Sequence, residues 1–177
     1  MAGRIDETRE FKPLRIAVLT ISDTRTLDND RSGDRLITHL EEAGHTLATR
    51  AIVKDTITDI QATVTDWVAS NNIDVIITTG GTGITGRDVT PEALRPLFDV
   101  EIPGFGELFR QLSYELIGTS TIQSRALAGR TKATLIFALP GSPSACSDGW
   151  TWILSTQLDY RYRPCNFAEL LPRFLET

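Results

Sequence analysis

The chain has 177 residues and a net charge of −5 at pH 7, and 41% of its residues are hydrophobic. This size suits one folded domain, so we expect residues 1–177 to form a single domain that starts with a polar arm at residues 1–13. The acidic balance argues against a nucleic-acid-binding protein, and the absence of a signal peptide, membrane span or lipidation motif predicts a cytoplasmic protein without a membrane partner.

Two cysteines and two histidines limit the metal chemistry that the chain can carry. Cys146 and Cys165 form no C-x-x-C pair, and neither clusters with His39 or His45, so no zinc site is expected. We expect each cysteine to be a small buried or half-buried residue. Both histidines are expected to have structural roles.

The first half of the chain predicts two strand–helix units. Residues 14–21 form a nearly continuous apolar run, typical of a central parallel strand, and residues 46–53 form the second predicted strand. Ser32 is the predicted cap of the first helix, which Gly44 ends. The second helix carries apolar side chains at helical spacing between residues 57 and 68.

The second half continues this alternation around two glycine corners. Its predicted strands cover residues 73–79 and 133–139, with a short or antiparallel one near residues 123–127. Its predicted helices follow the expected N-cap Thr90, with Pro91 in the first turn, and cover residues 108–116 and 144–158. Strands that alternate with helices through short turns predict a three-layer α/β/α fold, a mostly parallel sheet with helices on both faces.

The first corner, Gly80-Gly81-Thr82-Gly83, lies between a strand and a helix. Glycines let backbone N–H groups approach a ligand closely, and such groups beside a helix N-terminus favour phosphate. A tight turn that needs glycine only for its geometry is the alternative. The G-x-G-x-x-G spacing of residues 81–86 also matches a nicotinamide-dependent oxidoreductase, but Pro91 starts the helix too late for that fold.

Carboxylates follow three of the predicted strands. Asp23, Asp55 and Asp88 would share one edge of a parallel sheet with the glycine corners, which suits phosphate chemistry with a divalent cation. Each acid by itself also fits a turn former or a helix cap. Arg87 and Arg125 are either solvated surface charges or phosphate clamps, and Arg125 is the better candidate for a clamp.

Short motifs, in the same order over about residues 13–167, resemble the MoaB/MogA family of molybdenum cofactor biosynthesis proteins, whose module also occurs in gephyrin. The matching stretches are Ile21-Ser22-Asp23, Asp30-Arg31-Ser32-Gly33, Thr78 to Gly83, Arg87 to Ala93, Pro103 to Glu107, Ser124-Arg125 and Leu139 to Pro143. Lys54 and the stretch from Arg163 to Phe167 resemble MoaB more than MogA.

The resemblance implies a molybdopterin-binding fold and an adenylyltransferase that activates molybdopterin with ATP and Mg²⁺, giving adenylyl-molybdopterin and pyrophosphate. It implies that Asp55 and Asp88 are catalytic and hold the Mg²⁺. The substrate pocket that it implies contains Ser22, Asp23, Thr79, Gly80, Gly81, Thr82, Gly83, Ser124, Arg125, Pro140, Gly141 and Ser142.

The resemblance also implies a homo-oligomer, a trimer or a hexamer, and contacts with other molybdenum cofactor enzymes. The apolar region of Phe109, Leu112 and Tyr114 is the expected interface between subunits. Some members of the family depart at the acids and are regarded as inactive, so a non-catalytic molybdopterin-binding or scaffold paralogue is the alternative function. The three retained carboxylates favour the enzyme.

Overall fold

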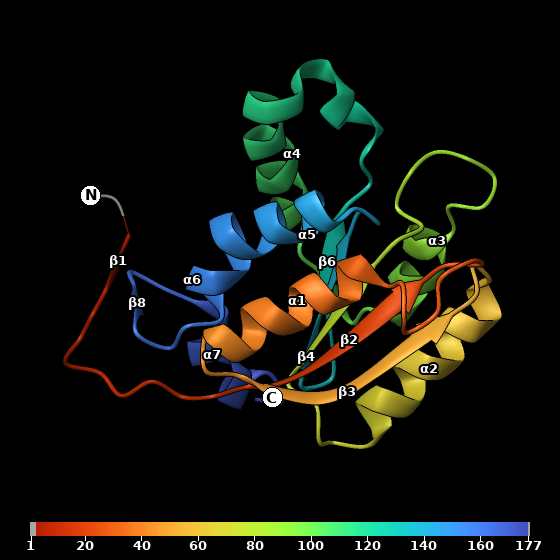
Figure 1. The fold of residues 1–177 in the computed structure, drawn as a ribbon. Coiled ribbons are helices and arrows are strands. Elements are labelled where there is room, and N and C mark those ends of the chain that lie inside the picture. Colours follow the sequence, from red (N-terminus) through yellow and green to blue (C-terminus); the bar gives the residue numbers. More distant parts are fainter. Residues whose placement is uncertain (1–2, 177) are drawn as a thin grey trace.

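A six-stranded sheet forms the centre of the molecule in the computed structural model, which describes residues 3–176 (Figure 1). The strand order is β3-β2-β4-β7-β6-β5. The strands are β2 (Arg15–Ile21), β3 (Thr46–Val53), β4 (Val75–Thr79), β5 (Val100–Glu101), β6 (Leu127–Thr131) and β7 (Thr134–Leu139). Because β3, β2, β4 and β7 pair in parallel, the prediction of a mostly parallel sheet is confirmed.

The remaining two strands form an antiparallel edge. β6 pairs antiparallel with β7, and β5 pairs antiparallel with β6. The sequence predicts such a strand near residues 123–127, but the structure places β6 later because residues up to Gln123 belong to a 3-10 helix, η2 (Gly118–Gln123). The two residues of β5 are too few to show a strand period, so sequence reasoning misses that strand.

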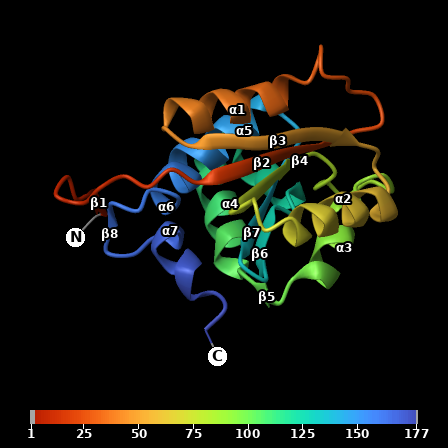
Figure 2. The ribbon, with the colours of Figure 1, turned by 90° about the horizontal axis from the view of Figure 1, so that it is seen from below.

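Helices cover both faces of the sheet (Figures 1 and 2). One face carries α1 (Arg31–Glu42), α4 (Pro103–Ile117) and α5 (Pro143–Gly149), which continues through the π-helical turn η3 (Trp150–Leu154) into α6 (Ser155–Gln157). The other face carries α2 (Ile57–Ala69) and α3 (Thr90–Leu94), after which the 3-10 helix η1 (Arg95–Leu97) leads to β5. Figure 2 shows α1 and α2 on opposite sides of β2 and β3.

The alternation of side chains along the strands divides the core into two layers. Ile16 of β2 packs in a cluster with Leu36 of α1, whereas the next residue, Ala17, packs on the opposite face in a cluster with Ile60 of α2. Successive side chains of a strand point to opposite faces, so a strand between two helical layers must be apolar throughout. The predicted three-layer fold is therefore confirmed.

Asp30, and not the predicted Ser32, caps helix α1. Its buried carboxylate accepts hydrogen bonds from the Gly33 backbone N at 2.9 Å, the Thr20 hydroxyl at 2.7 Å and the Arg50 guanidinium at 2.8 Å. Burial would raise the pKa of Asp30, but the Arg50 guanidinium and the two other donors lower it overall. This network ties the start of α1 to β2 and β3.

Helix α4 begins at Pro103, whereas the sequence predicts a helix only from residue 108. Pro103, Gly104 and Gly106 are residue types typical of a loop, but proline also suits the first turn of a helix. Gly106 faces Ala126, and a Cβ atom on Gly106 would overlap the Ala126 carbonyl oxygen. This glycine therefore allows close packing of α4 on the chain leading into β6, and does not break the helix.

β1 (Arg4–Ile5) and β8 (Tyr162–Arg163) form a two-stranded ribbon at the side of the molecule (Figure 1). The two strands pair antiparallel, and α7 (Phe167–Leu170) and η4 (Leu171–Arg173) follow β8. Arg9 donates a hydrogen bond to Glu169 of α7 at 3.0 Å. From residue 4 onward, the predicted polar arm is therefore docked on the C-terminal segment; residues 1 and 2 lie outside the described residues.

The cysteines and histidines occupy ordinary structural positions. Cys146 is buried, but Cys165 is exposed, so the prediction of at least half-burial is wrong for Cys165. His45 accepts a hydrogen bond from the Leu14 backbone N at 3.1 Å, and His39 lies 3.1 Å from the Ser147 hydroxyl. No helix within residues 3–176 combines the length and the apolar character needed to cross a membrane.

Candidate functional site

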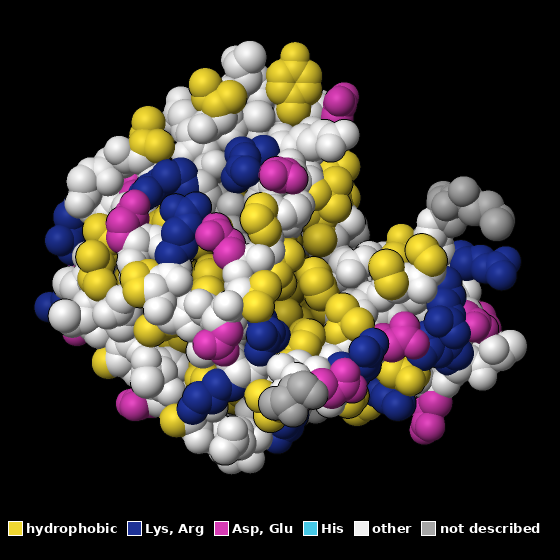
Figure 3. Space-filling view, turned by 180° about the vertical axis from the view of Figure 1, so that it is seen from behind, with side chains coloured by type: hydrophobic (Ala, Val, Ile, Leu, Met, Phe, Trp, Pro, Cys, Tyr) yellow, Lys and Arg dark blue, Asp and Glu magenta, His cyan; other side chains and the backbone are white. Residues whose placement is uncertain are grey.

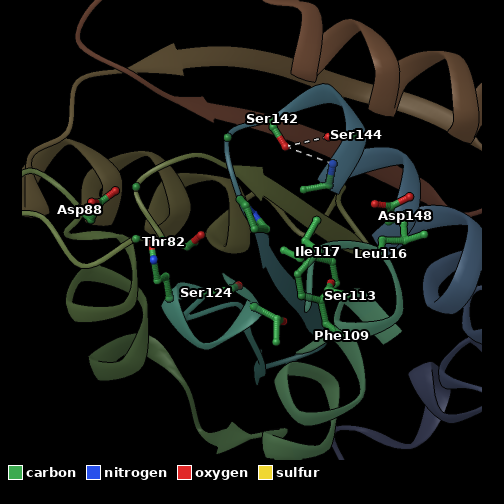
Figure 4. A pocket seen from close by; sticks show the side chains of 17 residues that line it. Thr82, Asp88, Phe109, Ser113, Leu116, Ile117, Ser124, Ser142, Ser144 and Asp148 are labelled. Atoms are coloured by element: carbon green, nitrogen blue, oxygen red, sulfur yellow. Dashed lines mark hydrogen bonds between the residues drawn. The ribbon is translucent and has the colours of Figure 1, made fainter. Parts of the chain in front are cut away.

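A pocket of about 430 Å³ lies at the carboxyl ends of β4 and β7 (Figure 4). The loop after β4 contributes Gly81, Thr82, Gly83 and Asp88, and the turn after β7 contributes Pro140, Gly141 and Ser142. The rest of its wall comes from α4, η2, the residue after η2 and α5: Phe109, Ser113, Leu116, Ile117, Thr121, Gln123, Ser124, Ser144, Ala145 and Asp148. Ligands bind at this edge in open α/β sheets, so the pocket is the candidate functional site.

The glycine loop has a geometry that requires glycine at two positions. Gly80 and Gly81 have positive φ angles of 106° and 63°. A Cβ atom on Gly80 would overlap the Ile21 carbonyl oxygen, and one on Gly81 would overlap the Thr90 hydroxyl. The geometric explanation for these two glycines is therefore correct, and it leaves the ligand-binding explanation open for the loop as a whole.

Thr90 binds this loop, whereas the sequence predicts that Thr90 caps α3. Its hydroxyl donates a hydrogen bond to the Gly80 carbonyl oxygen at 2.8 Å, and its backbone N donates to the Gly81 carbonyl oxygen at 3.0 Å. Val89 takes the N-cap position without a side-chain hydrogen bond. Because Thr90 is buried and bound twice to the loop, it holds the glycine backbone in place at the edge of the pocket.

The three predicted carboxylates converge on this loop. The Asp55 backbone N donates to Asp23 Oδ1 at 3.3 Å. A Cβ atom on Gly81 would lie 3.2 Å from Asp55 Oδ1, and one on Gly83 would lie 2.7 Å from Asp88 Oδ2. The missing side chains of the glycines thus make room for two carboxylates at one edge of the sheet.

The three acids differ in their electrostatic surroundings. Burial, and then the neighbouring carboxylates of Asp23 and Asp88, raise the pKa of Asp55. A hydrogen bond from the Arg87 guanidinium lowers the pKa of Asp23. Burial opposes ionisation of Asp88, but hydrogen bonds, foremost those from Thr85, lower its pKa overall. Asp55 is therefore the one of the three carboxylates whose ionised form its surroundings disfavour.

The carboxylates of Asp55 and Asp88 suit a divalent cation that also binds phosphate oxygens of a ligand. Among residues 3–176, no group of three acidic, histidine or cysteine side chains forms a complete metal site. Two carboxylates are the usual protein contribution to a Mg²⁺ ion whose other ligands are water and phosphate oxygens. Asp55 and Asp88 flank the same glycine loop and would supply these two carboxylates.

Both candidate phosphate clamps bind the protein itself. Arg87 pairs with Asp23, with 2.6 Å between Nη2 and Oδ2. Arg125 donates to the carbonyl oxygens of Gly83 and Asp88 at 2.6 Å each, and it also pairs with Glu92. Arg125 therefore braces the glycine loop from behind, and its guanidinium does not line the pocket.

The residues implied by the family resemblance divide into three groups. The pocket contains Gly81, Thr82, Gly83, Asp88, Ser124, Pro140, Gly141 and Ser142. A neighbouring hollow contains Ser22 and Asp23, and a small cavity between the two contains Thr79 and Gly80. Asp55 lies against Gly81, and Arg125 lines a separate hollow on the far side of the loop. The roles of all these residues remain predictions.

Sequence reasoning misses the wall that α4 and α5 supply. Phe109 and Leu116 of α4 line the pocket, and no local pattern tells which part of an apolar helix face turns toward a cavity. Hydrophobic side chains also lie on the outside of the lobe formed by α4 and η2 (Figure 3). Leu108, Tyr114 and Ile122 are exposed there. Phe109, which the sequence places in the expected interface, is only 2% exposed and packs in the core, so that part of the expectation is wrong. Formation of a homo-oligomer through the exposed part of this region remains a prediction.

The fold and the site define an α/β/α protein with a glycine-rich, carboxylate-bearing pocket at the carboxyl edge of its parallel sheet. The family described as "Probable molybdopterin binding domain" matches residues 17–160. The chain belongs to this family, whose members take part in molybdenum cofactor biosynthesis.

Named relatives and a solved structure agree with this assignment. The chain is 54% identical over 158 residues to molybdenum cofactor biosynthesis protein B of Escherichia coli (strain K12), covering 89% of this chain and 93% of the relative. It is 50% identical over 144 residues to the protein of the same name in Bacillus subtilis (strain 168), covering 80% and 85%. A crystal structure of molybdenum cofactor biosynthesis protein B superimposes with a TM-score of 0.86 at 39% identity, covering 96% of this chain and 100% of that one.

Proposed function

We propose that the protein adenylylates molybdopterin, using ATP and Mg²⁺ and releasing pyrophosphate. The observation that carries this proposal is the convergence of Asp23, Asp55 and Asp88 on one glycine loop at the edge of a 430 Å³ pocket. Family membership supports molybdopterin as the substrate. The carboxylates support a reaction at phosphate, because they supply oxygen ligands for a divalent cation.

The protein's part in this reaction is to hold two substrates in line. A phosphate oxygen of molybdopterin attacks the α-phosphorus of ATP, the bond to the β-phosphate breaks, and pyrophosphate leaves. Backbone N–H groups of the loop from Gly81 to Gly83 hold the attacking phosphate at the edge of the pocket. Asp55 and Asp88 would hold a Mg²⁺ ion, which would supply charge neutralisation at the triphosphate.

A second candidate function is binding of molybdopterin without catalysis. The observation that favours it is the state of Arg87 and Arg125, because both guanidinium groups bind the protein itself and leave the triphosphate without an evident arginine clamp. A scaffold that holds molybdopterin for another enzyme would need the pocket and the glycine loop, but not the three carboxylates.

Pyrophosphate release from ATP separates the two candidates. An adenylyltransferase releases pyrophosphate only when molybdopterin and Mg²⁺ are both present. We expect Asp88→Asn and Asp55→Asn each to lower this rate about 100-fold or more, because each removes a charge that orients the reacting phosphates. Asp66→Asn is the matched control, since Asp66 is exposed near the far end of α2.

Two results would contradict the proposal. The first is a wild-type protein that binds molybdopterin and releases no pyrophosphate, which would establish the binding function. The second is an Asp88→Asn variant that is folded and adenylylates molybdopterin at the wild-type rate, which would remove the carboxylates from the mechanism. Thermal unfolding of each variant shows whether it is folded.

A further inference from the structure

The pocket has two chemically different ends (Figure 4). Asp88 and the glycine loop lie at one end, where we place the phosphate. Asp148, from α5, lies at the other end beside Leu116 of α4. An elongated substrate that fills the pocket therefore presents one end to the glycine loop and the other to Asp148.

Asp148 is a carboxylate without a partner in the protein. No residue within the described range 3–176 donates a hydrogen bond to it or forms an ion pair with it, and burial raises the pKa of its carboxyl. It is partly buried beside the apolar side chains of Phe109, Leu116 and Ile117, which line the same pocket. A half-desolvated carboxylate with free acceptor positions is costly, unless a ligand supplies donors.

The chemistry of a pterin matches this end of the pocket. The pyrimidinone ring of a pterin carries an amino group at C2 and an N–H at N3, two donors that point the same way. A carboxylate accepts both at once, as it does from a guanidinium. The flat faces of the ring need apolar contacts, which Phe109, Leu116 and Ile117 can provide.

We propose that Asp148 binds the amino-pyrimidinone edge of the pterin ring and determines the specificity of the pocket for pterins. This inference rests on the proposed function in one respect, namely that a pterin occupies the pocket. It assigns the pterin to the α4–α5 end and the phosphate to the glycine loop, so the orientation of the substrate follows from the two ends.

A pair of ligands that differ at one position tests the proposal. Lumazine is a pterin whose 2-amino group is replaced by an oxygen atom, so it lacks one of the two donors. Chemical-shift titration measures the dissociation constants of pterin and lumazine for the wild-type protein and for Asp148→Asn. We expect the wild type to prefer pterin by about 10-fold to 100-fold, the range for a hydrogen bond to a charged group. In Asp148→Asn this preference should fall to within about 3-fold, because the amide presents one acceptor in place of two.

The control variant is Asp66→Asn, which removes an exposed carboxylate outside the pocket and should keep the wild-type preference. An Asp148→Asn variant that is folded and still prefers pterin as strongly as the wild type would overturn the inference. So would a wild-type protein that binds the two ligands equally.

The failure of this inference can be told from the failure of the proposed function. If Asp148→Asn keeps the pterin preference while the wild type releases pyrophosphate, the adenylyltransferase stands and Asp148 has no part in recognition. If the preference depends on Asp148 while no pyrophosphate is released, Asp148 recognises the pterin in a protein that only binds it.

Discussion

Two glycines of the same loop should respond very differently to replacement by alanine. Gly80 has a φ of 106°, and a Cβ atom there would lie 3.2 Å from the Ile21 carbonyl carbon and closer still to its oxygen. A left-handed backbone costs a non-glycine residue about 1–3 kcal/mol. Displacement of packed backbone costs about 1–3 kcal/mol more. Gly80→Ala should therefore lower the free energy of unfolding by about 2–6 kcal/mol.

Gly86 is the matched control, because it has no positive φ and nothing lies within 4 Å of a Cβ atom built there. Gly86→Ala should change the free energy of unfolding by no more than about 1 kcal/mol, in either direction. Equilibrium unfolding in urea measures both variants against the wild type. A Gly80→Ala protein as stable as Gly86→Ala would refute the reasoning, since it would show that the loop has room for a side chain beside Ile21.

The remaining predictions concern pH and assembly. Burial lowers the pKa of His45 to about 4 from 6.5, with nearby Asp159 acting in the opposite direction, so the unfolded chain takes up a proton on acidification before the folded protein does. The contribution of neutral His45 to the free energy of unfolding is complete above pH 6.5 and is lost as the pH falls toward 4. Between pH 7 and pH 5 the free energy of unfolding of the wild type should fall by about 2 kcal/mol more than that of a His45→Gln variant. An equal fall in the two proteins would contradict this prediction. Tyr114 is 54% exposed on the outside of α4, so Tyr114→Glu should dissociate the expected trimer or hexamer. Light scattering measures the mass of the wild type and of the variant. A monomeric wild type, or a variant with the same mass as an oligomeric wild type, would contradict the expected interface.

The strands and the edge that carries the acids could be predicted because their signals are local. A parallel strand between two helical layers shows as an apolar run such as Arg15–Ile21, and an acid that directly follows such a run must lie at the carboxyl edge of the sheet. Once the strands are parallel, Asp23 and Asp55, each just after the end of its strand, come together at that edge. Asp88 lies further along the loop after β4, and its position also depends on Thr85 and Arg125, which bind that loop.

The features that could not be predicted depend on contacts between distant segments. Ser32 and Asp30 both suit a helix cap, and the choice of Asp30 depends on Arg50 in another strand. The sequence predicts that Thr90 caps α3, but its hydroxyl binds the glycine loop instead. Asp148 looks like any polar residue of a helix, and only the position of α4 across the pocket from α5 makes it part of a pocket wall. Local periodicity carries no information about such neighbours.

The ribbon of β1 and β8 has a consequence for the order in which the chain assembles. Beside this ribbon, a hydrogen bond joins Arg9 to Glu169, which lies 160 positions further along the chain. While the protein is being synthesised, β1 and Arg9 have no partners until β8 and α7 have left the ribosome. The central sheet, from β2 to β7, can form earlier, so the pairing of β1 with β8 follows it, and a protease that cuts near residue 10 would distinguish chains before and after this pairing.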